Sequence, residues 1–429
     1  CDAERRLVRS SLHPPAVAAY GPTGADAVAA ARAELADAAQ RGYEAIAADV
    51  VAWWRAWWAH AARVEVDDPT ASLLYRLGMY KLGCISVPGS PAASLQGPWV
   101  EEHRLPPWSG DYHFNVNVQE CYWPAYAGNH LETLEPLAAM LHAWVPRMRE
   151  NARRYGGIDD GLLLPHAVDD RCTCMGGFWT GQTDHGSTAW AAQLLWQRYR
   201  HTLDRDYLRD VAYPLLRGAM RTYEEMLEPD GEALALPVGV SPEFGGSGAR
   251  AYGRNPSFQL ACAHAVCRAL LEASAALGLD GDDQRRWREV ARRLPLGNVA
   301  RVDRDIRGTE MVQSAVPAGD GELILWDGQP LTESHRHHAH LMALYPFGLL
   351  DPAGSEADRA LVANTLRRIT LEGMGAWTGW CLPWAAILYA RGGQHDEAGL
   401  LLEVFRRAYM GRGYYTTHDA VFRGLSVMA

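Results

Sequence analysis

The sequence predicts an all-α protein, specifically an (α/α)6 toroid of helical hairpins with a few short strands in its loops. Hydrophobic residues recur with the helical period along most of the 429 residues. The breaks between these stretches are short and carry Gly, Pro or Asp, as in 228–231 and 351–354. We find neither a βαβ alternation nor a glycine-rich nucleotide loop. About ten to twelve helices joined as antiparallel pairs fit a toroid better than a bundle.

The first helix is expected over 25–62. It carries Trp53, Trp54, Trp57 and Trp58, whose spacing places all four indoles on one face, interpreted as core. Further helices are expected at 70–88, 130–154, 185–203, 205–228, 256–278, 281–293, 336–347, 355–372, 377–392 and 394–410. Strands are expected only at 63–66, 234–240 and 323–325. We therefore predict an N-terminal approach segment and linker helix over 1–62 and a helical barrel over 63–429.

Composition excludes several classes of function. Lys and Arg number 41 against 51 Asp and Glu, a formal charge of −10, which argues against a nucleic-acid partner or an anionic membrane. No run of 18 apolar residues and no signal peptide is present, so no membrane insertion is predicted. Eight scattered cysteines form no disulfide framework, and nothing calls for a metal or an organic cofactor. The excess of Trp (16) and Tyr (18) over Phe (7) is typical of carbohydrate clefts, although about half of these rings would fill the core.

Glu243 is the best candidate for a general acid. Cleavage of a glycoside requires a carboxylic acid that protonates the leaving oxygen, with a base or nucleophile on the opposite face of the ring. Glu243 lies in a segment almost free of other charge, 237–246, and apolar neighbours would favour its protonated form. The alternative is a helix start, in which Ser241 caps a short turn. The residues alone favour neither interpretation over the other.

Two further segments carry grouped polar residues. If 108–123 is extended, His113, Asn115 and Asn117 share one face by period two and could hold a sugar or a water. The alternative is a polar edge strand. The histidine-rich run 332–341 lacks the spacing of a zinc motif and contains Arg336, so it favours sugar recognition or a helix start over a metal site.

In their order along the chain, these segments resemble glycoside hydrolase family 95, the inverting α-L-fucosidases. The runs 75–82, 91–99 and 115–123 are similar to the family's "GRYLL", "PANLQGIW" and "NINxQMNYW". Four runs downstream are similar to the family's "AW", "SPE", "HRHLSHL" and "GWS". They are, in the same order, 189–190, 241–243, 335–341 and 379–380. The resemblance covers roughly residues 42–424, and it implies an (α/α)6 barrel.

The resemblance also implies roles. Glu243 matches the general acid, Asn115 and Asn117 the asparagines that hold the attacking water, and Asp419 the aspartate that acts with them as base. His113, Arg336 and His337 match positions that contact the sugar, and Trp179 corresponds to an aromatic wall of the pocket. The implied partner is an oligosaccharide or glycan, cleaved by an exo-acting enzyme in a single displacement that inverts the anomeric carbon.

The sequence departs from the family pattern in three places. Glu120 and Cys121 replace a Met-Asn pair, Ala420 and Val421 replace the Gly-Asn that follows the aspartate, and the chain ends ten residues after Asp419. We therefore expect a barrel truncated at its C-terminal end. The alternatives are an α-L-galactosidase, a disaccharide phosphorylase and a non-catalytic carbohydrate-binding relative. Because members of the family are often exported, an extracytoplasmic location is expected, and the oligomeric state is left open.

Overall fold

The structure is a computed structural model, and it describes residues 24–95, 107–176, 181, 184–304, 309–314 and 316–411. Contacts divide the chain into two compact units, residues 1–62 and residues 63–429. Each unit is described by itself.

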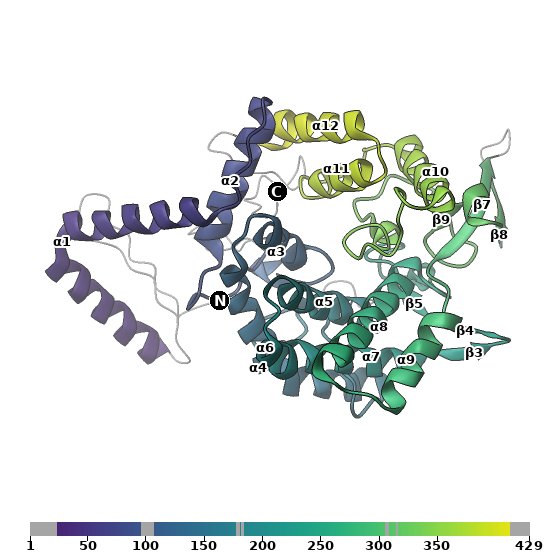
Figure 1. Ribbon diagram of the computed structural model, residues 1–429, viewed down its shortest axis with the longest axis horizontal. Helices are drawn as coiled ribbons and strands as arrows, with labels where there is room; N and C mark the ends of the chain where they lie inside the picture. Colours follow the sequence, from purple (N-terminus) through teal and green to yellow (C-terminus); the bar gives the residue numbers. More distant parts are fainter. Residues whose placement is uncertain are drawn as a thin grey trace. The chain divides into compact units, whose positions relative to one another are not determined.

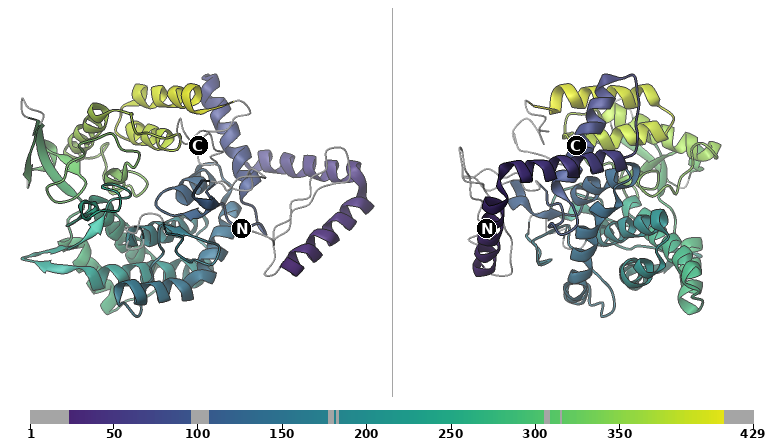
Figure 2. Two further views of the ribbon diagram at one scale, coloured as in Figure 1. Left: turned by 180° about the vertical axis from the view of Figure 1, so that it is seen from behind. Right: turned by 60° about the vertical axis from the view of Figure 1, so that its left-hand side comes forward.

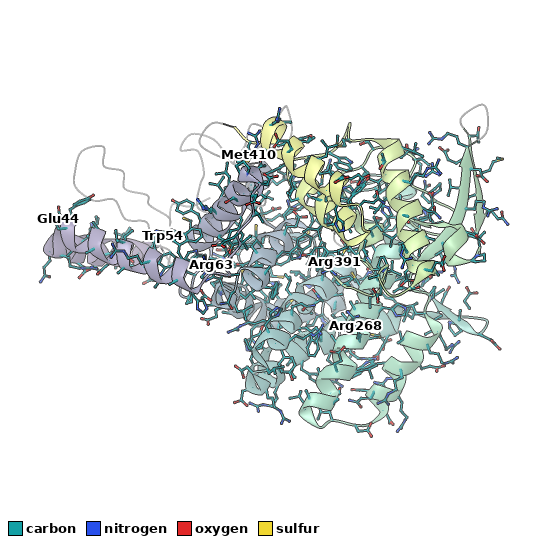
Figure 3. All side chains as sticks on the ribbon, turned by 45° about the horizontal axis from the view of Figure 1, so that its top comes forward. Glu44, Trp54, Arg63, Arg268, Arg391 and Met410 are labelled. Carbon is teal, nitrogen blue, oxygen red and sulfur yellow. The ribbon has the colours of Figure 1, made fainter. Side chains whose placement is uncertain are left out.

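In the first unit, α1 (Gly24–His60) is a pair of helical segments joined at Gly42, whose φ of 74° breaks the helix. The tryptophans of α1 were expected in the core, and this expectation is wrong for two of them. Trp57 is buried, but Trp53 and Trp58 are 42% and 40% exposed. The indoles instead stack on one another, Trp53 on Trp57 and Trp54 on Trp58. Trp54 is labelled on this helix in Figure 3.

The second unit is the predicted (α/α)6 barrel. Its helices follow one another around a central region, from α2 through α3, α5 and α8 to α10, α11 and α12 (Figure 1). α3 contacts α2 and α5, α5 contacts α8, and α12 contacts both α11 and α2. α10 and α11 are joined by a hydrogen bond between the Thr370 and Tyr389 hydroxyls. The helices are α2 (Pro69–Ile85), α3 (Asn117–Ala127), α4 (Glu135–Asn151), α5 (His185–Thr202), α6 (Arg205–Tyr207), α7 (Tyr213–Met226), α8 (Ser257–Leu277), α9 (Asp282–Arg293), α10 (Glu356–Glu372), α11 (Cys381–Arg391) and α12 (His395–Val404).

Local sequence explains where these helices begin and end. Asp68 accepts hydrogen bonds from the backbone N–H groups of Thr70 and Ala71 and so caps α2. Asp184 caps α5 in the same way, through Gly186. The C-terminal end of α8 is fixed by Gly278. This glycine adopts a left-handed φ of 72°, a conformation that it reaches without strain and that stops the helix.

The core of the barrel lies where α5 and α8 pack together. Trp190 of α5 and Phe258 of α8 are fully buried, with ring centroids 6.5 Å apart. α8 is long and apolar enough to cross a membrane, but 61% of its most apolar stretch is buried within the protein, as expected of a core helix. Full burial of side chains of this size contributes about 1.5–3 kcal/mol each.

All strand pairs are antiparallel, and the strands lie in the connections between helices. β1 (Tyr112–His113) pairs with β2 (Ala167–Val168), β3 (Glu228–Asp230) with β4 (Ala233–Ala235), and β5 (Gly239–Val240) with β6 (Tyr252–Gly253). A three-stranded sheet has the order β8 (Glu310–Ser314), β7 (Asn298–Arg304), β9 (Glu322–Ile324). Figure 2 shows the β3–β4 hairpin and the β7–β8 pair projecting from the edge of the barrel.

Three local predictions are wrong. Residues 63–66 form no strand. Residues 108–123 are not extended throughout, because the chain leaves β1 at His113 and α3 starts at Asn117. Residues 336–347 contain only the one-turn 3-10 helix η8 (Ala339–Leu341).

The segment after η8 is held by backbone turns and by side chains. Tyr345 N donates to the Leu341 carbonyl and Phe347 N to the Met342 carbonyl, both at 3.2 Å. Arg268 Nη1 donates to the carbonyl of Gly348 at 3.0 Å, and the Arg391 guanidinium lies 5.3 Å from the centre of the Tyr345 ring. Both arginines are labelled in Figure 3. Pro346 has no N–H to donate and so cannot continue a helical ladder.

Candidate active site

Glu243 lies in a tight turn after β5. Its φ is 60°, a left-handed conformation that non-glycine residues adopt at a cost of about 1–2 kcal/mol. The turn is closed by hydrogen bonds from Phe244 N to the Ser241 carbonyl and from Gly246 N to the Glu243 carbonyl. Gly245 also has positive φ, and a Cβ there would meet the Arg250 carbonyl at 2.7 Å. The turn does not start a helix, so the capping interpretation of Ser241 is wrong.

Four side chains from distant parts of the chain surround the Glu243 carboxylate. Asn115 Nδ2 donates to Oε1 at 3.0 Å, and His113 Nε2 lies 3.8 Å from the same oxygen. Oε2 accepts a hydrogen bond from Arg336 Nη2 and lies 3.2 Å from His337 Nε2. The side chain of Glu243 is only 7% exposed. The structure thus brings five of the eight predicted site residues into contact with one another.

Backbone elements fix the positions of these partners. His113 ends β1, opposite Ala167 of β2, and the Phe114 N–H donates to the His166 carbonyl. Asn115 then follows in a turn that Gln119 closes by donating from Nε2 to the Phe114 carbonyl. Phe114 is fully buried, so its side chain anchors the turn and directs its polar neighbours toward Glu243.

The charge around Glu243 differs from the sequence-based expectation. Apolar neighbours were expected to favour its protonated form. Burial does raise the pKa of Glu243, but His337, His113 and Arg336 outweigh burial and hold the pKa well below its usual range. In the unliganded site Glu243 is therefore a carboxylate. These basic residues were predicted as sugar contacts, but their contact with Glu243 was missed because they come from other segments, Arg336 being 93 residues away in sequence.

The histidines around the carboxylate differ in charge. Burial lowers the pKa of His113, but hydrogen bonds to Asp111 and Glu243 raise it to about 9, so this ring is an imidazolium at neutral pH. Burial lowers the pKa of His337, although the neighbouring Glu243 carboxylate raises it. Burial also lowers the pKa of His166, to about 3, and its ring centroid lies 5.2 Å from that of His113.

Asn117 lines a small cavity beside Glu243. The cavity has a volume of about 20 Å³, which is room for about one water molecule. A sugar ring therefore needs some lining side chains to move. Arg336 is the most exposed of the charged groups on Glu243, with 31% of its side chain accessible. The lining consists of Leu95, Trp108, His113, Asn117, Glu243, Arg336, His337 and Trp380.

Two predicted residues, Asp419 and Trp179, lie outside the described residues. Their roles remain predictions, as do the catalytic roles of the other six. Within the described ranges, no three or more His, Cys, Asp or Glu side chains are arranged to hold a metal ion.

Sequence reasoning missed Asp111 and Trp380. Asp111 is two residues before His113, so period two could have placed its carboxylate beside that ring. Trp380 is the N-terminal neighbour of α11, lines the cavity and packs on His337 at 4.9 Å between ring centroids. Its only signal was the Gly379-Trp380 pair.

Solved structures share this fold at low identity. A protein described as a kojibiose phosphorylase from the human microbiome matches with a TM-score of 0.61 and 9% identity, over 90% of this chain and 52% of that one. A protein described as a glycosidase, in a form with one substituted residue, matches with a TM-score of 0.53 and 14% identity, over 85% of this chain and 91% of that one. These likenesses show the fold alone.

Relatives in sequence are fucosidases by name. The Arabidopsis thaliana protein called alpha-L-fucosidase 2 is 27% identical over 350 residues, which are 77% of this chain and 37% of the relative. A protein of Aspergillus niger described as alpha-fucosidase A is 31% identical over 186 residues, which are 42% of this chain and 23% of the relative. This chain thus spans little more than a third of the length of the Arabidopsis relative. Residues 33–422 match the family model described as the glycosyl hydrolase family 95 catalytic domain, and the chain belongs to that family.

Proposed function

We propose that this chain hydrolyses α-L-fucosides from the end of a glycan, with inversion at the anomeric carbon. The observation that carries the proposal is the buried carboxylate of Glu243, which three basic side chains and Asn115 surround at a small cavity. Family membership and the fucosidase names of the relatives support the choice of sugar.

In the proposed mechanism, Glu243 protonates the departing oxygen while a water attacks from the opposite face of the sugar. Asn115 and Asn117 orient this water, and Asp419 accepts its proton. Asn115 contacts Glu243 through Nδ2, and its Oδ1 has no hydrogen-bond partner within the described part of the chain, so that oxygen is available to a water. Inversion further requires Glu243 and Asp419 to lie about 6.5–9.5 Å apart.

The resting charge of the site adds one requirement. Because Glu243 is a carboxylate before substrate binds, it must acquire a proton before it can act as acid. An uncharged sugar that displaces Arg336 would remove one of the cations that stabilise the carboxylate. The loss of that charge raises the pKa of Glu243 at the moment when its protonated form is needed.

The test is to incubate the purified chain with 2′-fucosyllactose and to follow anomeric protons by NMR from the earliest time points. Initial release of β-L-fucose supports both the substrate class and inversion, whereas initial release of the α-anomer contradicts inversion. Parallel incubations with an α-L-galactoside, and with inorganic phosphate present, test two rivals. Faster release of L-galactose, or formation of a sugar phosphate, would overturn the proposed assignment.

A second test separates an enzyme from a carbohydrate-binding relative. Replacing Glu243 by Gln keeps the size and one acceptor of the side chain but removes the transferable proton, so turnover should fall about 10²–10⁴-fold. The matched control Glu228→Gln changes an exposed carboxylate that pairs with Arg254 on the β3–β4 hairpin and should leave turnover unchanged. Full turnover by Glu243→Gln would contradict the role of this residue.

A further inference from the structure

Asp111, His113 and Glu243 form a line of three ionisable groups. Both carboxylate oxygens of Asp111 lie 3.2 Å from His113 Nδ1. The opposite ring nitrogen, Nε2, lies 3.8 Å from Glu243 Oε1. The side chains are 3%, 8% and 7% exposed, so water screens their charges weakly. One imidazole ring thus connects a carboxylate outside the cavity lining to the candidate acid.

Other charged or ionisable groups face this line. The His166 ring from the segment before β2 lies tilted beside His113, and His337 and Arg336 approach Glu243 from the segment before η8. Burial lowers the pKa of both histidines, that of His166 to about 3. Among these described groups, only Asp111 and Glu243 are anions within 4 Å of His113.

We propose that His113 stores the proton that Glu243 delivers to the leaving group, and that Asp111 is the positioning residue that keeps this proton on His113 between turnovers. The inference rests on the proposed function, because it assigns a source to the proton of the proposed acid. It concerns Asp111, whose side chain acts through His113 and lies outside the cavity lining.

The transfer balances in protons and charge. His113 passes the proton on Nε2 to Glu243 Oε1, so the imidazolium becomes a neutral imidazole and the carboxylate a neutral acid. Glu243 then donates this proton to the glycosidic oxygen as the C–O bond breaks, and becomes a carboxylate again. The attacking water gives up one proton to the base, and a proton from solvent restores the imidazolium. The 3.8 Å gap needs a shift of about 1 Å or one bridging water, as is common before substrate binds.

The negative charge of Asp111 determines how long the proton is retained as pH rises. His113 and Glu243 share protons, so their titration belongs to the pair. A fixed negative charge beside the pair raises the pH at which its last proton leaves. With Asp111 present, this pH follows the pKa of His113, about 9. With an uncharged residue at 111, the last proton should leave nearer the usual pKa of histidine, about 6.5.

The first experiment measures kcat/KM against pH on 2′-fucosyllactose for the wild type and Asp111→Asn. On the alkaline side of this profile kcat/KM falls as the last proton leaves, and we call this fall the alkaline limb. In the variant the alkaline limb should lie about one to two pH units lower. Asp111→Glu, which restores the charge, should return the limb toward its original position. The matched control is Glu132→Gln, which removes the carboxylate from another histidine pair, with His130, outside the cavity lining. This control should leave the limb in place.

A purely structural role for Asp111 gives a different result. Its loss would lower activity by a similar factor at every pH, and the limb would stay where it is. That outcome would overturn the inference, as would a limb shift of equal size in Glu132→Gln.

A second measurement needs neither activity nor a stable Asp111 variant. Histidine-labelled wild-type protein is titrated by NMR without substrate, and the His113 signal is assigned by its absence in His113→Gln. The His113 ring should remain protonated at pH 8. A midpoint at or below about 6.5, the unperturbed value, overturns the inference whatever Asp111→Asn does.

The two proposals fail in distinguishable ways. If Glu243→Gln retains turnover, or no glycoside is cleaved, the proposed function fails while the NMR titration can still show a charged His113. If Glu243→Gln loses turnover but the limb of Asp111→Asn does not move, the proposed function stands and the proton store is wrong.

Discussion

Asn115 Nδ2 lies 3.0 Å from Glu243 Oε1, so a residue expected to hold the attacking water is bonded directly to the expected acid. An amide donor stabilises a carboxylate more than a neutral carboxyl. Asn115 therefore joins His113, Arg336 and His337 in favouring the charged form of Glu243. Asn117, the other member of the predicted pair, lines the cavity two residues further on and opens α3.

Replacing Asn115 by Ala should distinguish these two asparagines. Loss of a hydrogen bond to a charged group removes about 1.5–3 kcal/mol of interaction, part of which water replaces, so the pKa of Glu243 should rise by about one unit. A ¹³C NMR titration of the Glu243 carboxyl, assigned by its absence in Glu243→Gln, should show this rise in Asn115→Ala and no change in Asn117→Ala. Both variants should have lower kcat, since each loses a predicted water ligand. An equal rise of the Glu243 pKa in the two variants would contradict the separate roles.

Replacing Arg336 by Met should move the alkaline limb of kcat/KM to higher pH, because it removes a fixed positive charge beside the proton-sharing pair His113 and Glu243. The guanidinium is a fixed positive charge hydrogen-bonded to Glu243, and a neighbouring charge of this kind shifts a carboxyl pKa by about one to three units. The limb should therefore rise, opposite to the fall expected for Asp111→Asn. Arg268→Met is the control, because Arg268 binds backbone carbonyls of the segment after η8 and not Glu243. A limb that stays in place in Arg336→Met would show that this contact does not govern the acid.

The fold was predictable wherever helices carry a regular apolar face and a clear stop. α8 matches its prediction closely, because the apolar period is continuous and Gly278 ends it. The prediction failed for β7 and β8. In β7 the charged Arg301 and Asp303 alternate with apolar residues over only four positions, 300–303, a run too short to indicate a strand. It failed again at 336–347, where buried histidines imitate a helical pattern while their positions are fixed by contacts with residues distant in sequence.

The site was predictable in its residues but not in its charge. An isolated Glu in a Gly/Pro-rich loop indicated Glu243. Period two indicated His113 and Asn115, although the chain is not extended after His113 and a turn brings Asn115 to Glu243. The contacts around Glu243 could not be predicted, because Asn115 and Arg336 are separated from it by 128 and 93 residues and only the closed barrel brings them together. Local composition therefore suggested an apolar setting and a raised pKa, whereas the fold provides basic neighbours and a lowered one.

Gly253 should tolerate no side chain. It lies in β6, which pairs with the strand that leads to Glu243, and an added Cβ would overlap the Trp326 ring. Gly253→Ala should lower the free energy of unfolding by about 1–3 kcal/mol, the usual cost of overpacking. Gly78→Ala is the control, because nothing lies within 4 Å of the added Cβ in α2, and it should raise the free energy of unfolding by about 0.5–1 kcal/mol. Urea denaturation of the wild type and the two variants measures whether the free energy of unfolding falls in Gly253→Ala and rises in Gly78→Ala. Equal stabilities would show that the Trp326 ring moves aside without cost.

Asp184 should make the barrel less stable as pH rises from about 4 to 6. It is fully buried at the start of α5, and burial raises its pKa to about 6 despite hydrogen bonds from Gln259, Ser187 and Gly186. The unfolded chain has a value near 3.8, so between these two pH values the folded state binds more protons, and stability falls with pH.

Asp184→Asn should abolish this dependence without losing the cap. Oδ1 of an asparagine can still accept from Gly186 N and Gln259 Nε2, while Nδ2 can donate to Ser187 Oγ. Relative to the wild type, the variant should therefore gain up to about 3 kcal/mol between pH 4 and pH 7. Urea denaturation of both proteins at intervals of one pH unit measures the difference. A difference that is constant across this range would mean that Asp184 keeps an ordinary pKa, and that its three hydrogen bonds offset the cost of burial.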